Sequence, residues 1–292
     1  MTITVGLLAH HLRPPAQELG RHLAERLTAL GAIVQVPEHD AKLSGLEPWA
    51  VSEASFRHGC TFAISVGGDG TMLRTLDLSG DSPVLGVNVG HVGYLTAVTP
   101  EEVQDKGDAM LHDLLAGNYH IESRMTLEVR VDGTPLSLRA VNDAVVEKSS
   151  AGNTVRLGVD FHGVPFTDYS ADGLIVATPT GSTAYAFSAR GPVVSPMMDA
   201  MVVVPVAAHM LFDRSLVLDG NEIVSVRVLD GRAAALFVDG RPCGPLGEGA
   251  VVTMRRHNSP ARLITFVPRE FHQILRTKFG LAAAQPWKQP GH

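Results

Sequence analysis

Residues 61–78 read TFAISVGGDGTMLRTLDL, and this stretch decides how the first half of the chain folds. An apolar run of strand length leads into a turn with three glycines, and a run compatible with a helix follows. Glycines let the backbone turn tightly and approach a ligand closely, because they carry no Cβ. We expect Thr71 to cap the helix, whose free N–H groups would attract phosphate. The three glycines are Gly67, Gly68 and Gly70.

An acid stands in the middle of this turn. A loop that binds anions should avoid a carboxylate unless the chemistry needs one, so Asp69 is expected to bind a metal or to accept a proton beside phosphates. The alternative is a structural role in which Asp69 only caps the helix. Phosphofructokinases and the diacylglycerol and sphingosine kinases carry related turns, so the turn alone does not fix the substrate.

The composition is that of an ordinary globular protein. The chain of 292 residues suits two modest domains or one large one, and an apolar fraction of 45% is ample for a core. A net charge of −6 gives no basic surface for nucleic acid or an anionic membrane. The two cysteines, Cys60 and Cys243, predict neither disulfides nor a thiolate zinc site, which favours a cytoplasmic protein. The most apolar stretch, residues 200–208, is too short to span a bilayer.

Two kinds of pattern divide the chain. Up to residue 120 strands and helices alternate, which predicts an α/β domain with a mostly parallel sheet. A loop that contains Pro37 and Pro48 is expected after the second strand. Residues 121–268 carry short β-rich runs separated by Asp-Gly turns, which predicts a β-rich, sandwich-like domain. Residues 269–292 begin with a helical composition from Arg269 to Phe279, and we expect this segment to pack back on the first domain.

Three further blocks carry polar groups where strands end. Residues 86–95 (GVNVGHVGYL) form a second glycine-rich turn that contains Asn88. Asn142-Asp143 ends a strand of the β-rich half. Residues 172–185 (DGLIVATPTGSTAY) join an acidic turn, a buried strand and a loop rich in hydroxyl groups.

Together these blocks resemble the NAD kinase family, which phosphorylates NAD to NADP. The resemblance runs from about Ile64 to Gly240, and residues 207–212 with Arg214 look like the loop that returns between the family's domains. The resemblance implies transfer of the terminal phosphate of ATP or polyphosphate to the 2′-hydroxyl of the adenosine ribose. Asp69 would be the base or orienting acceptor for this hydroxyl, and the glycines would bring N–H groups near the phosphates. Arg74 would add positive charge there, or would be an ordinary solvated helix arginine.

The resemblance also implies that the β-rich residues 121–268 form the NAD-binding domain, and it assigns NAD contacts. Asn142 would pair with the adenine edge, and Asp143 would accept bonds from ribose hydroxyls in the place of the family's glutamate. Asp172 would contact the nicotinamide half; without the family, it and the Asn-Asp pair would be ordinary turns. A loop after the buried strand would wrap the adenine; its members are Thr180, Thr183, Ala184, Tyr185, Ala186, Phe187 and Ser188. Without the family, Tyr185 could equally belong to the core. Asn88 is a further expected contact, and less firmly aligned ones are Asn153 (or Arg156), Ser170 and Arg241.

The thirteen histidines show no zinc-binding spacing, so we expect no structural metal; His10-His11 could approach phosphates or lie in an exposed loop. A divalent cation, Mg²⁺, is expected to be held through the donor's phosphates. The family implies a homodimer or homotetramer.

Two rival functions remain: a lipid or sugar kinase that shares the GGDGT turn, and a non-catalytic regulator that binds NAD(P). The carboxylate of Asp69 argues against the regulator, because binding alone does not need it.

Overall fold

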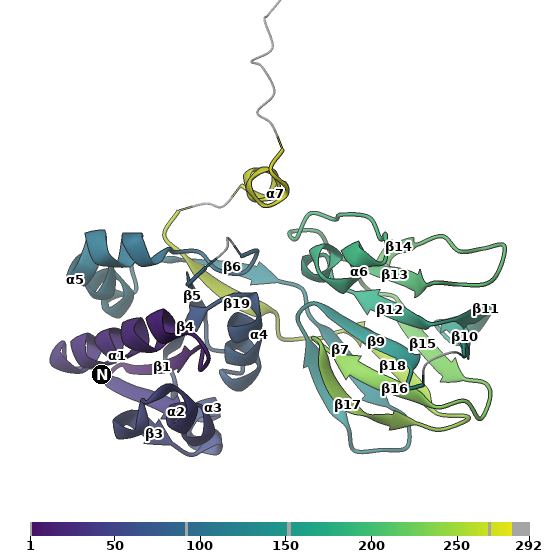
Figure 1. Ribbon diagram of the computed structural model, residues 1–292, viewed down its shortest axis with the longest axis horizontal. Helices are drawn as coiled ribbons and strands as arrows, with labels where there is room; N and C mark the ends of the chain where they lie inside the picture. Colours follow the sequence, from purple (N-terminus) through teal and green to yellow (C-terminus); the bar gives the residue numbers. More distant parts are fainter. Residues whose placement is uncertain (1, 91–92, 151–152, 268–269, 282–292) are drawn as a thin grey trace, which may run out of the picture. The chain divides into compact units, whose positions relative to one another are not determined.

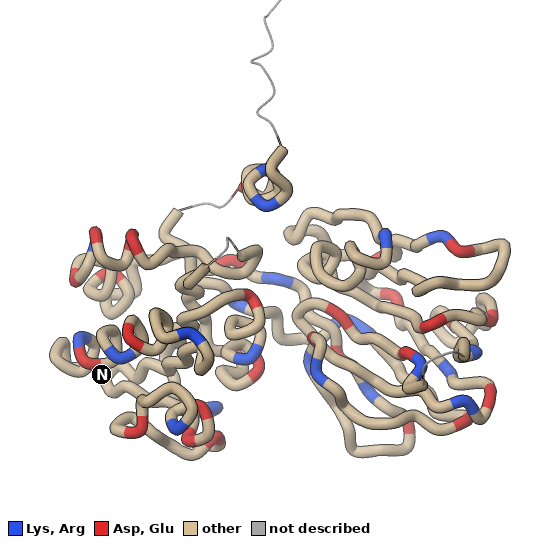
Figure 2. The backbone as a smooth tube through the Cα atoms, viewed as in Figure 1, with Lys and Arg blue, Asp and Glu red and all other residues tan. Residues whose placement is uncertain are grey.

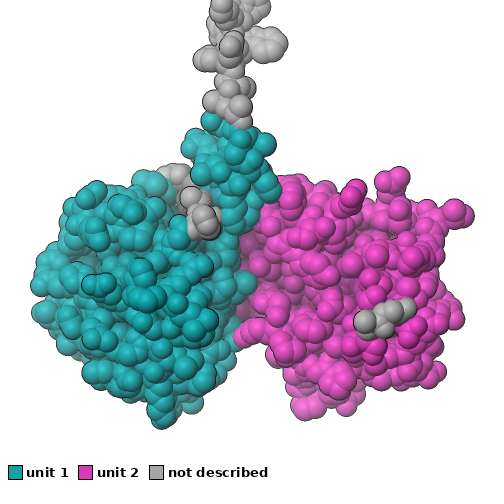
Figure 3. Space-filling model, in the orientation of Figure 1, with its two compact units in different colours: residues 1–121, 264–292 teal, residues 122–263 magenta. Residues whose placement is uncertain are grey.

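The computed structural model describes residues 2–90, 93–150, 153–267 and 270–281. The chain divides into two compact units, one of residues 1–121 with 264–292 and one of residues 122–263 (Figure 3). The C-terminal residues are thus grouped with the first unit. The division expected from the sequence, at residues 120 and 268, stays a prediction. Acidic and basic residues are interspersed along both units (Figure 2).

The first unit is built on a seven-stranded sheet with the order β3-β2-β1-β4-β5-β19-β6 (Figure 1). The pairs among β1 to β5 are all parallel, so the carboxyl ends of β1 and β4 lie at the same edge of the sheet. The strands are β1 (Thr4–Ala9), β2 (Ile33–Pro37), β3 (Ala50–Val51), β4 (Phe62–Gly67), β5 (Val84–Asn88), β6 (His120–Arg124) and β19 (Ala261–Thr265).

Helices of this unit follow from the sequence signals beside them. Leu23 and Leu27 recur at helical spacing in α1 and are fully buried, and Gly31 after the helix has a φ of 85°. Thr99 and Glu102 form a capping box at the start of α5. The helices are α1 (Pro14–Ala29), α2 (Glu38–Ser44), α3 (Glu53–Gly59), α4 (Asp69–Leu78), α5 (Pro100–Ala116) and α7 (Phe271–Phe279), with the 3₁₀ turn η1 (Glu47–Trp49).

The second unit holds two six-stranded sheets, whose pairs are antiparallel. Their orders are β11-β10-β15-β18-β7-β8 and β14-β13-β12-β9-β16-β17. Apolar residues of both sheets share one buried cluster, which makes this a sandwich. The strands are β7 (Leu127–Val131), β8 (Ser137–Ala140), β9 (Asp143–Lys148), β10 (Val155–Phe161), β11 (Val164–Ala171), β12 (Gly173–Ala177), β13 (Ala200–Val206), β14 (Leu216–Asp219), β15 (Ile223–Val228), β16 (Ala234–Val238), β17 (Arg241–Leu246) and β18 (Val251–Arg256).

The expected fold class is confirmed: a mostly parallel α/β unit, a β-rich sandwich and a final helix. Among the described residues, no helix is both long and apolar enough to cross a membrane. The final helix was expected to begin at Arg269, a residue outside the described ranges, and α7 begins at Phe271. His91 and Val92 of the second glycine-rich turn also lie outside them.

Some local expectations were wrong. Thr71 is not a helix cap, because the chain turns at Gly67-Gly68 and α4 already begins at Asp69, with Gly68 as N-cap. The segment after Pro37 is not only a loop: α2 and α3 lie there, and seven residues each are too few for a clear helical period. The expected adenine loop folds as two short helical turns, η2 (Thr180–Thr183) and α6 (Tyr185–Ser188).

Candidate functional site

Asp69 is held by the second glycine-rich turn and does not cap its own helix. Its Oδ2 accepts a hydrogen bond from the backbone N–H of Tyr94 and its Oδ1 accepts one from Leu95, each at 3.0 Å. A Cβ on Gly93 would lie 2.3 Å from Oδ1 of Asp69, so the turn comes this close only because that residue is glycine. The two glycine-rich turns therefore fix the direction of this carboxylate together.

A cation from the end of the chain completes the surroundings of Asp69. The Nζ of Lys278, on α7, lies 3.5 Å from Oδ2 of Asp69. The same ammonium group lies 4.0 Å from the centre of the Tyr94 ring, within cation–π distance. Asp69 and Lys278 keep 30% and 29% of their side-chain surface exposed, so a ligand can reach both.

A cavity of about 320 Å³ opens beside this carboxylate in the first unit. It lies at the carboxyl ends of β1 and β4, where ligands commonly bind in parallel sheets. Arg74 faces it but is not a free cation, because its guanidinium donates to both oxygens of Asp40 at 2.7 and 2.8 Å. The lining residues are Leu8, Ala9, His10, His11, Arg13, Asp40, Gly68, Asp69, Gly70, Thr71 and Arg74.

Three nitrogen-bearing side chains of the segment between β1 and α1 line this cavity. His10 and His11 stack with their ring centres 5.6 Å apart, and Arg13 donates to the carbonyl oxygen of Val89. Burial, with the charges of Arg13 and His11, lowers the pKa of His10, which favours its neutral form. Both histidines line the cavity and His11 is also exposed in the loop after β1, so their two expected placements both stay open. Together with the N–H groups at the start of α4, these side chains suit a polyanion.

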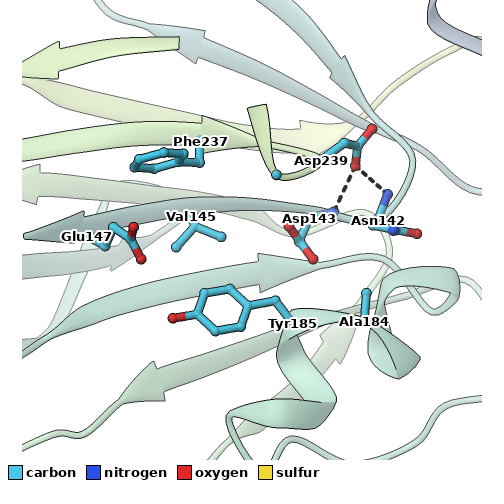
Figure 4. Close-up of a pocket in the computed structure, with 9 residues that line it drawn as sticks. Asn142, Asp143, Val145, Glu147, Ala184, Tyr185, Phe237 and Asp239 are labelled. Carbon is cyan, nitrogen blue, oxygen red and sulfur yellow. Dashed lines mark hydrogen bonds between the residues drawn. The ribbon is translucent and has the colours of Figure 1, made fainter. Parts of the chain in front are cut away.

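A second cavity, of about 420 Å³, lies in the second unit. The rings of Tyr185 and Phe237 face it from opposite sides of the strand that carries Val145, and Asp143 points toward the space between them (Figure 4). Tyr185 is 40% exposed, so it is a wall of this cavity and not part of the core. The lining residues are Asn142, Asp143, Val145, Glu147, Ala184, Tyr185, Phe237, Asp239 and Gly240.

Two carboxyl groups meet in this second cavity. Asp143 is only 4% exposed, and burial raises its pKa to about 7; the nearby Asp239 adds to this shift and a backbone N–H of Tyr185 opposes it. Burial also raises the pKa of Asp239, against three backbone N–H groups and Arg241. Three N–H groups favour the charged form of Asp239, whereas one such group favours that of Asp143.

The other predicted contacts lie outside both linings. Asp172, in the turn between β11 and β12, pairs with Lys148 at 2.6 Å, and Ser170 bonds with Thr154 at 3.1 Å. Thr180 and Ala186 are buried, and Asn153 and Arg241 are exposed. Two side chains of the adenine segment, Phe187 and Ser188, face solvent. Expected residues outside the linings are Gly67, Asn88, Asn153, Ser170, Asp172, Thr180, Thr183, Ala186, Phe187, Ser188 and Arg241.

Several residues that line these cavities, and one that contacts Asp69, were missed from the sequence. Asp239 was interpreted only as part of an Asp-Gly turn, and nothing in the sequence links it to Asn142-Asp143. Lys278 follows Asp69 by 209 positions, and Asp40 lay in a segment expected to be a loop. Glu147 and Phe237 lie on the neighbouring strands β9 and β16. Side chains alternate between the two faces of a strand, so knowing that these strands pair would have placed both residues on one face of the sheet.

Comparison with known proteins identifies the family. Residues 5–115 match the model of the ATP-NAD kinase N-terminal domain, and residues 141–266 match that of the ATP-NAD kinase C-terminal domain. The chain belongs to the NAD kinase family. It is 38% identical to NAD kinase 2 of Streptomyces avermitilis, over 99% of this chain and 98% of that protein. It is 35% identical to the NAD kinase of Thermobifida fusca, over 96% of this chain and 90% of that protein.

Solved structures agree. An NAD kinase from Archaeoglobus fulgidus in complex with ATP matches with a TM-score of 0.68 and 25% identity, over 96% of this chain and 98% of that one. Yeast NADH kinase complexed with NADH shares the fold with a TM-score of 0.86 at 21% identity, over 99% of this chain and 90% of that one. The expectation of an NAD kinase is therefore confirmed, and the rival lipid or sugar kinase and non-catalytic regulator are set aside.

Proposed function

We propose that the chain transfers the terminal phosphate of ATP to the 2′-hydroxyl of the adenosine ribose of NAD, with Asp69 as the proton acceptor. The oxygen of the hydroxyl forms a bond to the γ-phosphorus, the bond from that phosphorus to the bridging oxygen breaks, and ADP leaves. The hydroxyl proton passes to the carboxylate. The observation that carries this assignment is the fixed, half-exposed carboxylate of Asp69 beside a cavity suited to a polyanion.

The cavity of the first unit is assigned to the donor's phosphates. N–H groups at the start of α4, Arg13 and Arg74 would bind and orient them, and Lys278 would offset charge that develops on the transferred group. Arg74 would act while still paired with Asp40, which fixes its guanidinium. Polyphosphate would meet the same groups, because they recognise phosphates and not a base.

The cavity of the second unit is assigned to the nucleoside part of NAD. Asn142 would pair with the adenine edge, Tyr185 would contact the ring and the ionised form of Asp143 would accept from ribose hydroxyls. Asp172 is proposed to contact the nicotinamide half while paired with Lys148. The remaining contacts implied by the family resemblance stay proposals for the same ligand.

A divalent cation, Mg²⁺, would neutralise charge on the donor's phosphates. The two carboxylates of the first cavity offer the oxygen ligands that such a hard cation prefers. Both are already engaged, Asp40 by Arg74 and Asp69 by two N–H groups and Lys278. The cation would therefore be held mainly by the phosphates. We also propose a cytoplasmic homodimer or homotetramer, as the family resemblance implies.

Replacing the proposed base tests the function. We expect Asp69→Asn to lower the rate of NADP formation from ATP and NAD by at least about 100-fold. NAD binding, measured by calorimetry, should change little, because the assigned nucleoside pocket contains no part of Asp69. Asp105→Asn, which alters an exposed acid of α5, is the matched control. Near-normal turnover of Asp69→Asn would contradict the assignment of the base.

A further inference from the structure

Asp239 occupies an unusual backbone position beside the second cavity. It follows β16 with a φ of 50°, a left-handed conformation that residues other than glycine rarely adopt. Such a conformation persists where the surrounding contacts hold it. The next residue, Gly240, has a φ of 73°, so the two residues together form the left-handed turn between β16 and β17, where Asp-Gly is a common pair. The turn accounts for the backbone of Asp239, and the contacts of its side chain show what the carboxylate adds.

The carboxylate of Asp239 collects three consecutive backbone N–H groups. Its Oδ2 accepts from Val141 at 2.9 Å, and its Oδ1 accepts from Asn142 at 2.7 Å and from Asp143 at 3.2 Å. In return, the N–H of Asp239 donates to the carbonyl oxygen of Asp143 at 2.9 Å. Four hydrogen bonds thus join this one residue to residues 141–143, two of which carry predicted NAD contacts.

The same segment is fixed from its other side. The carbonyl oxygen of Asn142 accepts from the N–H of Thr178 at 2.8 Å, and the hydroxyl of Thr178 donates to the carbonyl oxygen of Val141 at 2.6 Å. A Cβ on Gly181 would lie 2.0 Å from the Asn142 oxygen, so the backbone there is closely packed. With Asp239 bonded to the N–H side, the peptides of residues 141–143 have no freedom to turn.

We propose that Asp239 is a positioning residue for NAD: by binding the N–H groups of residues 141–143, it aims the side chains of Asn142 and Asp143 into the nucleoside pocket. This inference rests on the proposed function of that pocket. Asp239 lines the cavity but need not touch the ligand, because its carboxylate oxygens are already occupied by N–H groups. Loss of this clamp would weaken NAD binding and leave the phosphate chemistry at Asp69 intact.

Asp239 also sets the electrostatic conditions of the pocket. The titratable groups around Asp143 are the carboxyl groups of Asp239, Glu147 and Asp172 and the phenol of Tyr185. Two basic groups lie nearby: Arg241 beside Asp239, and Lys148, which pairs with Asp172. The charge of Asp239 disfavours ionisation of Asp143, whose ionised form accepts from the ribose. An uncharged residue at 239 would therefore let Asp143 ionise at lower pH.

The test compares Asp239→Asn with Asp219→Asn, a change in an exposed Asp-Gly turn of the same unit. The amide keeps one acceptor but turns a donor toward the N–H groups. We expect the Michaelis constant and the dissociation constant for NAD to rise about tenfold, kcat to fall less than about threefold and the Michaelis constant for ATP to stay unchanged. In the parent protein, NAD binding should be about fivefold weaker one pH unit below the titration midpoint of Asp143 than at that midpoint. In Asp239→Asn this midpoint should move to lower pH.

An unchanged dissociation constant, or a fall in kcat without a change in NAD affinity, would overturn the inference, as would an unmoved midpoint. If Asp239→Asn does not fold, Asp239→Glu keeps the charge and adds one methylene; it should weaken NAD binding without moving the midpoint, and unchanged affinity would again overturn it. Binding measured by calorimetry separates this inference from the function: a parent protein that binds NAD but makes no NADP would sink the proposed function alone.

Discussion

Asp69 and Asp143 are both carboxylates of predicted site motifs, yet the protein surrounds them differently. Asp69 is half-exposed and faces two N–H donors and the ammonium group of Lys278. Asp143 is almost fully buried, and its neighbour is a second carboxyl group, Asp239. The donors around Asp69 fix the direction of its carboxylate, whereas burial and a neighbouring acid let Asp143 retain its proton up to higher pH. The first arrangement suits a carboxylate aimed at one ligand atom, and the second would make ligand binding sensitive to pH.

The largest effect should come from disturbing the surroundings of Asp69 without changing Asp69 itself. In Gly93→Ala, the new methyl group would lie 2.3 Å from Oδ1 of Asp69 and 2.5 Å from Oγ1 of Thr96. The carboxylate would have to move and would lose its bond from Leu95. We expect NADP formation to fall at least about 100-fold, as for loss of the base itself.

Gly247→Ala is the control for this change, because no described residue other than its chain neighbours has an atom within 4 Å of the added methyl group. NAD affinity and melting temperature should be measured for both variants. If Gly93→Ala turned over at the parental rate, the carboxylate would not need its present direction, and the contrast between the two acids would lose its functional meaning.

The second effect concerns stability against pH and isolates Asp143. Its pKa is raised by burial from 3.8 to about 7, so the folded state binds this proton more tightly than the unfolded state. The free energy of unfolding must then fall as pH rises from the unfolded pKa to the folded one. Asp143→Asn removes this dependence. Between about pH 5 and pH 8 the parent should therefore lose roughly 2 kcal/mol more stability than the variant, measured by urea unfolding. Parallel pH profiles for the two proteins would contradict the shift.

A smaller effect is expected at Lys278. Lys278→Met removes the ammonium group beside Asp69 and keeps the length of the side chain, and it should lower kcat about tenfold by removing charge stabilisation near the transferred phosphate. The melting temperature should hardly change, because a half-exposed ion pair contributes little to stability. Arg276→Met, on an exposed position of the same helix, is the control. Equal kcat values for both variants would show that Lys278 is not part of the donor site.

Local sequence patterns predicted much of the fold. The strand, turn and helix around Gly67 lie next to one another in the chain, so their order could be deduced from periodicity and glycines alone. The edge of the sheet could not be predicted in this way. Strand β19 lies between β5 and β6 in the sheet although it follows them by more than a hundred residues, and such a pairing leaves no local signal.

The same distinction applies to the two cavities. Asp69, Asn142, Asp143 and Tyr185 were found because each stands in a recognisable block. Their neighbours were not, since Asp239 reaches Asn142 over 97 positions and Lys278 reaches Asp69 over 209. The family resemblance supplied roles for the blocks but not for these partners. What surrounds a carboxylate, and hence its protonation, is a property of the fold.

The smallest effect should follow from lengthening Asp143. The family resemblance puts a glutamate here, and Asp143→Glu adds one methylene while keeping the charge and the hydrogen bond from the backbone N–H of residue 143 to Asp239. We expect the Michaelis constant for NAD to change by less than about tenfold, or 1.4 kcal/mol, because the acceptor group is retained. Turnover at saturating NAD should stay near the parental value, since nothing around Asp69 is altered. Complete loss of activity would mean that the pocket between Tyr185 and Phe237 is closed to the longer acid, and that burial at Asp143 depends on side-chain length as much as on Asp239.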